Sequence, residues 1–166
     1  MGVYKARRFS QSTKKLGIHD KVLMAAAEEV MQGIWEADLG SGVIKKRLPL
    51  QQGKSGGART IIFFKSANHV FFYDGWSKSG LSSKGTKEIE DDELAAYKKM
   101  ANAFLAFSNK QIEDLIETGF LIEVKMSDKL QMMLEDAKEL NALGLMSDSE
   151  VDAIAVMVKA VKSAPV

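Results

Sequence analysis

Apolar residues along this chain recur at two spacings, one typical of helices and the other typical of strands. Spacings of three and four predict helices over residues 20–33, 91–107 and 109–118, with Asp20 capping the first and Ser108 or Asn109 capping the third. Apolar and aromatic runs predict strands over residues 43–48, 59–65, 70–76 and 120–124, and Val3 and Tyr4 indicate a short edge strand. The uninterrupted apolar runs indicate central strands, covered on one face by helices.

A second pattern begins after Lys125. Leucine, methionine and alanine residues at helical spacing predict an amphipathic helix that starts near Met126 and stops at Gly144, and Ser147 or Ser149 caps a further helix. The order of elements predicts an α+β fold, with a small, mainly antiparallel sheet packed with helices in residues 1–125. Residues 126–166 form a C-terminal helical extension in this interpretation.

Composition narrows the class of protein. Apolar residues make up 46% of the 166 residues, which is ordinary for a globular protein with a core. No apolar run is as long as a membrane span, and the basic N-terminus is not followed by the apolar stretch of a signal peptide. The chain has no cysteine, which excludes disulfides and cysteine zinc sites. We therefore expect a cytoplasmic protein that does not use a membrane.

Charge is divided between the two halves of the chain. Residues 1–84 carry fourteen Lys or Arg and six Asp or Glu, a net charge of +8, whereas residues 85–166 carry nine and sixteen, a net charge of −7. Such asymmetry favours a polyanionic partner for the basic half, or docking of the acidic half on it. Two solvent-exposed surfaces of opposite charge, without any such partner, would give the same net charges.

Two kinds of catalytic site can be set aside. Gly53, Lys54 and Ser55 match the end of a nucleotide-binding P-loop, but the leading glycine is replaced by Leu48 and a strand follows instead of a helix. His19 and His69 have no metal-ligand spacing, and each is most simply a turn or cap residue. We expect neither a metal nor a cofactor.

Cations are the remaining candidates for chemistry. Five Lys or Arg and three glycines lie within residues 45–59, and further cations follow the next strands. Because side chains alternate along a strand, Lys45 and Arg47 share one face and Lys46 points to the other. A cationic surface can bind RNA phosphates and stabilise a pentavalent phosphorane without metal, and a lysine beside other cations can act as a general base. A basic surface with purely structural aromatic residues would show the same pattern.

The motifs resemble those of a known family. The segments ADLGSGVIKKR (37–47), GKSGGART (53–60) and FFYDGWSKS (71–79), with the later GFLIEV (119–124), look like a subgroup of the RelE/HigB-type toxins. These toxins belong to bacterial and phage type II toxin–antitoxin systems. The resemblance covers about residues 1–125.

The resemblance implies a RelE-like sheet and an endoribonuclease, an mRNA interferase that inhibits translation by cutting mRNA, typically on the ribosome. In such enzymes the ribose 2′-hydroxyl attacks the adjacent phosphate. Carried over by position, the catalytic candidates are Lys45, Lys46, Arg47, Arg59 and Lys78. The RNA-binding candidates are Lys54, Lys65, Tyr73 and Trp76, of which the two aromatic residues would stack on a base. The chain departs from better-studied relatives because no obvious catalytic Tyr or His follows Lys78, so the general acid is not identified.

Residues 126–166 resemble the N-terminus of the partner antitoxin, with Met126 as its start. This tail has four Lys and seven acidic residues, a net charge of −3. The expected partners are therefore mRNA, and either a cognate antitoxin or the chain's own tail, which would restrain the toxin; a homo-oligomer is also open. The alternative function is a catalytically inactive member that binds RNA or protein within a toxin–antitoxin repressor complex. An oligomerisation helix pair unrelated to the active site would explain the tail equally.

Overall fold

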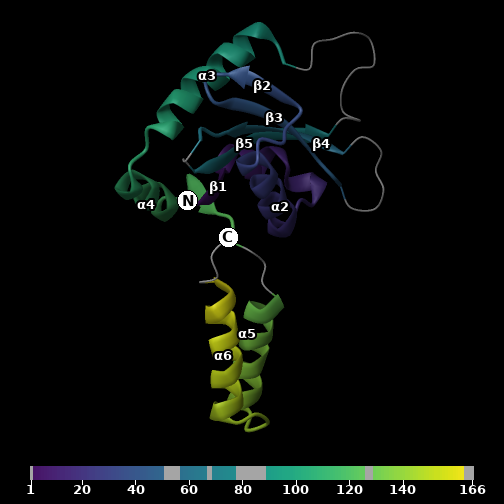
Figure 1. Ribbon diagram of the computed structural model, residues 1–166, viewed down its shortest axis with the longest axis vertical. Helices are drawn as coiled ribbons and strands as arrows, with labels where there is room; N and C mark the ends of the chain where they lie inside the picture. The colour runs from purple at the N-terminus through teal and green to yellow at the C-terminus, as the bar shows by residue number, and fades with distance from the viewer. Residues whose placement is uncertain (1, 51–56, 67–68, 78–88, 126–128, 163–166) are drawn as a thin grey trace. The chain divides into compact units, whose positions relative to one another are not determined.

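The computed structural model describes residues 2–50, 57–66, 69–77, 89–125 and 129–162 (Figure 1). The chain divides into two compact units, Met1–Lys125 and Met126–Val166. The elements of the first unit are β1 (Val3–Ala6), α1 (Arg7–Ser12), a 3-10 turn η1 (Lys14–Leu16), α2 (Asp20–Met31), β2 (Ala37–Gly40), β3 (Val43–Leu48), β4 (Ala58–Phe63), β5 (Val70–Ser77), α3 (Asp91–Leu105), α4 (Asn109–Glu117) and β6 (Leu121–Glu123). The second unit contains α5 (Lys129–Ala142) and α6 (Asp148–Lys162).

The strands form one six-stranded sheet in the order β2-β3-β4-β5-β1-β6. Neighbouring strands are antiparallel except β1 and β5, which are parallel. The predicted α+β fold with a mainly antiparallel sheet is therefore confirmed. The prediction that Val3 and Tyr4 open an edge strand is wrong, because β6 pairs with the outer side of β1 and completes the sheet. The sequence pattern also missed β2, which pairs with β3 in a short hairpin.

Helices cover both faces of the sheet, not one as the pattern indicated. On one face α2 packs Leu23, Ala27 and Val30 against a layer that includes Ile44 and Ile62. On the other face α3 and α4 pack against the neighbouring strand positions, among them Val43, Ile61, Phe63, Phe71, Tyr97, Ala101, Phe104 and Ile112. Successive residues of β3 and β4 thus enter different cores, which explains why these strands read as continuous apolar runs.

Two helix starts differ in how well the sequence predicted them. Ser108 caps α4 as predicted, since its hydroxyl accepts a hydrogen bond from the backbone N–H of Gln111 at 3.1 Å. Asp20 is not a cap: it is the first residue of α2, and the capping position is His19. The Asp20 carboxylate instead forms an ion pair with Lys5 Nζ at 3.2 Å.

The second unit consists of α5 and α6 packed against each other (Figure 1). Leu134, Ala137 and Val158 are buried between them, and Gly144 in the connecting turn has a φ of 73°. Ser147 caps α6, because its hydroxyl accepts a hydrogen bond from the backbone N–H of Glu150. Several large apolar side chains of this unit stay exposed: Met132, Met133, Leu140, Leu143, Leu145, Val156 and Met157.

Within the described ranges, none of the helices combines the length and the apolar character needed to cross a bilayer.

Candidate functional site

The strand register places three of the predicted site residues next to one another. Arg47 of β3 lies directly opposite Arg59 of β4, and Arg59 lies directly opposite Trp76 of β5. Directly paired residues point to the same face of a sheet, so the two arginines and the indole form one row across three strands. Lys45 lies in the next row on the same face, opposite Ile61. This face is the one that α3 and α4 cover in part.

The two arginines of this pair can hold one anion between them. The Cβ atoms of such cross-strand pairs are about 5 Å apart. Two guanidinium groups at that spacing can donate hydrogen bonds to different oxygens of the same anion. The Arg47–Arg59 pair is therefore a suitable site for a phosphate.

Lys46 lies on the other face and is not brought together with the other cations. Its side chain is 3% exposed, and its Nζ forms an ion pair with Glu29 of α2 at 2.6 Å. The same ammonium group donates a hydrogen bond to the backbone carbonyl of Ile34 at 3.1 Å. These bonds link β3 to α2 and to the segment that follows it. The predicted catalytic role of Lys46 stays a prediction.

The two predicted base-stacking residues have different surroundings. Tyr73 is partly buried and packs against the core: it is stacked on Phe63 at a centroid distance of 4.7 Å and makes T-shaped contacts with Tyr97 and Phe104. Trp76 is partly exposed beside Arg59, and within the described part of the chain its buried indole N–H has no hydrogen-bond partner. Of the two, only Trp76 belongs to the row of Arg47 and Arg59, which we call the cationic row.

The remaining predicted residues are distant or not described. Lys65 is exposed six residues after Arg59 and lies beyond the far end of β4, which corresponds to about 20 Å along an extended chain. Lys54 and Lys78 lie outside the described residues. The predicted roles of all three in RNA binding or catalysis stay predictions.

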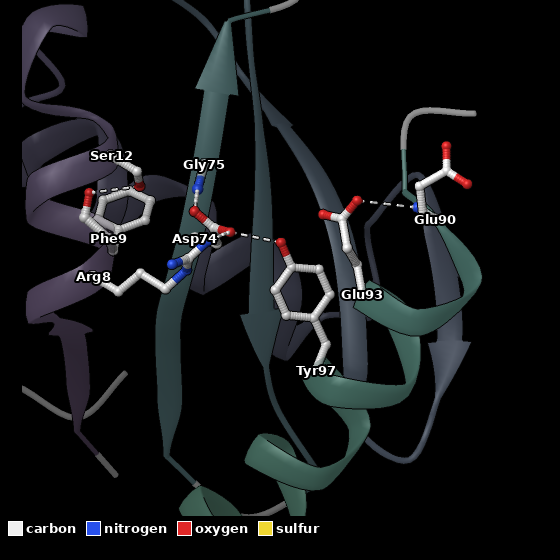
Figure 2. A network of polar contacts seen from close by, with 8 residues as sticks. All are labelled: Arg8, Phe9, Ser12, Asp74, Gly75, Glu90, Glu93 and Tyr97. Atoms are coloured by element: carbon white, nitrogen blue, oxygen red, sulfur yellow. Dashed lines mark hydrogen bonds and ion pairs between the residues drawn. The ribbon is translucent and has the colours of Figure 1, made fainter. Parts of the chain in front are cut away.

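A buried carboxylate, that of Asp74, lies one row away from the arginine pair. Figure 2 shows Asp74 with its hydrogen-bond partners. Asp74 of β5 lies opposite Ile61, which in turn lies opposite Lys45. Its carboxylate accepts hydrogen bonds from the Tyr97 hydroxyl at 2.6 Å, from Arg8 Nη2 at 3.0 Å and from the backbone N–H of Gly75 at 2.9 Å. Burial, and then the bond to Asp74, raises the pKa of Tyr97, so that its hydroxyl remains a donor over the physiological range.

Sequence reasoning missed the roles of Arg8, Asp74 and Tyr97. One signal was available: an aspartate inside the apolar run of β5 must be paired or hydrogen-bonded if it is buried. The sequence does not say which residues pair with it, because its partners come from α1, 66 positions earlier, and α3, 23 positions later.

Histidine has a structural role at one of the two positions. Nδ1 of His69 accepts a hydrogen bond from the backbone N–H of Gly2 at 2.8 Å, and its ring contacts Tyr4 and Phe71 edge-on. In the described ranges, no three His, Cys, Asp or Glu side chains come together as possible metal ligands.

A family model described as the RelE toxin of the RelE/RelB toxin–antitoxin system matches residues 1–124. The chain belongs to the RelE toxin family. No individually curated protein matches the sequence. The matched range coincides with the first compact unit to within one residue and contains the whole cationic row. This RelE-family protein is thus the toxin of a toxin–antitoxin system, and membership implies an antitoxin as its partner.

Proposed function

We propose that this RelE-family toxin is an endoribonuclease that cuts mRNA on the ribosome, in the cytoplasm, and thereby inhibits translation. The Arg47–Arg59 pair carries the proposal, because two guanidinium groups placed opposite each other on one face of the sheet can bind different oxygens of one phosphate. Trp76 beside Arg59 supplies an aromatic surface for a neighbouring base.

The chemistry proposed for this face needs no metal. The 2′-hydroxyl of one nucleotide attacks its own 3′-phosphate, the bond from phosphorus to the 5′-oxygen of the next nucleotide breaks, and a 2′,3′-cyclic phosphate results. Arg47 and Arg59 stabilise the charge that develops on the phosphorane oxygens. Arginine does not lose its proton in proteins, whereas the neutral amine form of a lysine can accept one. Lys45, in the row next to the arginine pair, accepts the 2′-hydroxyl proton in that form, and the leaving 5′-oxygen takes a proton from water.

The direct test is cleavage by the purified full-length chain. A ribosome-bound mRNA is incubated with the protein in the Mg²⁺ buffer that keeps the ribosome intact, and the new ends are mapped. The same mRNA with a 2′-O-methyl group at the cut site is the control. We expect cuts that leave 2′,3′-cyclic or opened phosphate ends and that the 2′-O-methyl group abolishes. Binding to RNA without any cut would support the alternative, an inactive member of a repressor complex. Cuts that leave 3′-hydroxyl and 5′-phosphate ends would contradict attack by the 2′-hydroxyl.

Two neighbouring lysines on opposite faces provide a matched test of which face acts on RNA. We expect Lys45→Met to lower the cleavage rate by roughly 10²-fold, the usual contribution of a positioned proton-transfer group. Lys46→Met removes the same charge from the buried side of β3, and Glu29, about half exposed, can be solvated instead. We therefore expect it to leave cleavage within about twofold, measured on samples of verified thermal stability. Equal losses for both substitutions would instead support a catalytic Lys46.

We further propose that the C-terminal helices restrain the toxin. Residues 126–166 have a net charge of −3, opposite to the charge of residues 1–84, and Glu135, Asp136 and Glu139 are exposed on α5. The exposed methionine, leucine and valine side chains of α5 and α6 supply apolar area that a second surface could bury. Acidic side chains together with exposed apolar side chains are what an antitoxin-like segment would need to bind the basic toxin unit.

A further inference from the structure

Arg8 is an exposed cation with a rigid anchor. Its side chain is 57% exposed, yet Nη2 forms an ion pair at 3.0 Å with Asp74, whose side chain is only 6% exposed. An arginine side chain on a surface is normally mobile and loses conformational entropy when it binds a ligand. Here the buried carboxylate already holds the guanidinium group in place, so part of that cost is removed.

Asp74 itself has a fixed orientation (Figure 2). One carboxylate oxygen accepts from the backbone N–H of Gly75, and the other accepts from both Tyr97 and Arg8. Tyr97 is buried in the core between the sheet and α3, where its ring contacts Tyr73. The direction of the Arg8 side chain therefore depends on residues of β5 and α3.

Arg8 adds a cation at the end of the row beside the cationic row. Lys45, Ile61 and Asp74 lie opposite one another on β3, β4 and β5, next to the row of Arg47, Arg59 and Trp76. Adjacent strands are about 4.8 Å apart, so Asp74 is roughly 10 Å from the β3 cations. Arg8 reaches Asp74 from α1, which follows the next strand, β1. Lys45 and Arg8 thus lie at the two ends of the line that runs through Ile61 and Asp74 across this face of the sheet.

A shallow cleft of about 250 Å³ adjoins Arg8. It is lined by Arg8, Tyr73, Glu93, Ala96, Tyr97 and Met100. One end is cationic, and the wall from α3 is mostly aromatic and apolar, with one carboxylate. Such a cleft suits a nucleotide: a phosphate near the guanidinium group, a base against the ring and thioether, and a base N–H donated to Glu93.

We propose that Arg8 and this cleft form a second RNA subsite, which binds the nucleotide next to the one cut at the arginine pair. Arg8 contacts the phosphate of that nucleotide, and Asp74 is a positioning residue that holds Arg8. The inference rests on the proposed action on RNA. The competing explanation is that the Arg8–Asp74 pair only stabilises the fold.

The test measures affinity for a short single-stranded RNA that carries 2′-O-methyl groups and cannot be cut, over a range of salt concentrations. Arg8→Gln removes the charge but can still donate a hydrogen bond to Asp74, which protects the fold. We expect it to weaken binding by about tenfold or more, and to lower the slope of log affinity against log salt by about 0.7, the value for one lost phosphate contact on single strands. Loss of a purely structural ion pair would leave this slope unchanged.

Two further variants separate positioning from overall charge. Arg7→Ala is the matched control, because Arg7 has the same charge in the same turn but bonds to the carbonyls of Thr118 and Gly119; we expect less than a twofold change. Asp74→Asn removes a negative charge near the RNA, so overall electrostatics would tighten binding, whereas loss of positioning weakens it. We expect weaker binding, by about threefold or more.

The outcomes are distinguishable from failure of the proposed function. If wild-type protein binds the RNA and Arg59→Ala abolishes binding, but Arg8→Gln behaves like Arg7→Ala, the subsite is refuted while the arginine pair stands. Tighter binding by Asp74→Asn also refutes it. If the wild-type protein neither binds nor cuts RNA, the proposed function fails and the subsite fails with it.

Discussion

Arg59→Ala is expected to lower the rate of RNA cleavage by about 10²–10³-fold, the usual cost of removing one preorganised charge-stabilising donor. Arg59 lies in a central strand between Arg47 and Trp76, so its backbone position is set by hydrogen bonding on both sides. The Arg59 side chain is only partly buried, so its truncation leaves the core in place and the fold should tolerate it. We expect the variant to retain its thermal stability and to lose growth arrest when expressed in cells.

Arg59→Lys and Lys110→Ala make this prediction specific. Lysine keeps the charge but not the planar fork that binds two phosphate oxygens, so Arg59→Lys should recover only part of the activity. Lys110 is an exposed lysine of α4 that forms an ion pair with Asp114 on the same helix, and its substitution removes a charge away from the cationic row. If Lys110→Ala reduced cleavage as much as Arg59→Ala, net charge rather than the arginine pair would explain the activity.

The sequence predicted local structure better than it predicted strand order. The bounds of β3 were predicted correctly, because Gly42 with its φ of 82° precedes it and Pro49, which lacks a backbone N–H donor, follows it. The position of β1 inside the sheet was not predicted, since it depends on pairing with β6, more than a hundred residues later. The burial of both faces could have been inferred from the uninterrupted apolar runs of β4 and β5, because alternation disappears when both sides of a strand are covered.

The same distinction holds for the candidate site. Alternation along β3 was enough to separate Lys45 and Arg47 from Lys46, and the burial of Lys46 beside Glu29 agrees with that separation. The cluster of Arg8, Asp74 and Tyr97 joins residues from three elements, so spacing along the chain gave no indication of it. A buried charge needs hydrogen-bonding or charged partners, and the sequence does not show which residues these are until the fold is known.

Deletion of residues 126–166 is expected to increase growth arrest and RNA cleavage by roughly tenfold. The estimate follows from tethering: a segment linked to its target has an effective concentration of about 1 mM, so an intrinsic dissociation constant of about 100 µM would leave roughly one molecule in ten open. The remaining residues 1–125 form a compact unit that includes the whole sheet, which makes the truncated toxin a reasonable protein to test. Cleavage by equal amounts of the full and truncated chains gives the comparison.

A charge-neutralised tail provides the matched control for this deletion. Glu135→Gln, Asp136→Asn and Glu139→Gln change exposed positions of α5 and leave the buried Leu134 and Ala137 in place, so the helix pair should persist. If charge attraction holds the tail on the cationic face, the triple variant should cleave nearly as fast as the deletion, and added salt should activate the full-length chain but not the truncated one. Equal activity of full and truncated chains would remove the inhibitory role. Activation by deletion but not by neutralisation would instead indicate docking through the exposed apolar side chains, because that contact does not weaken with salt.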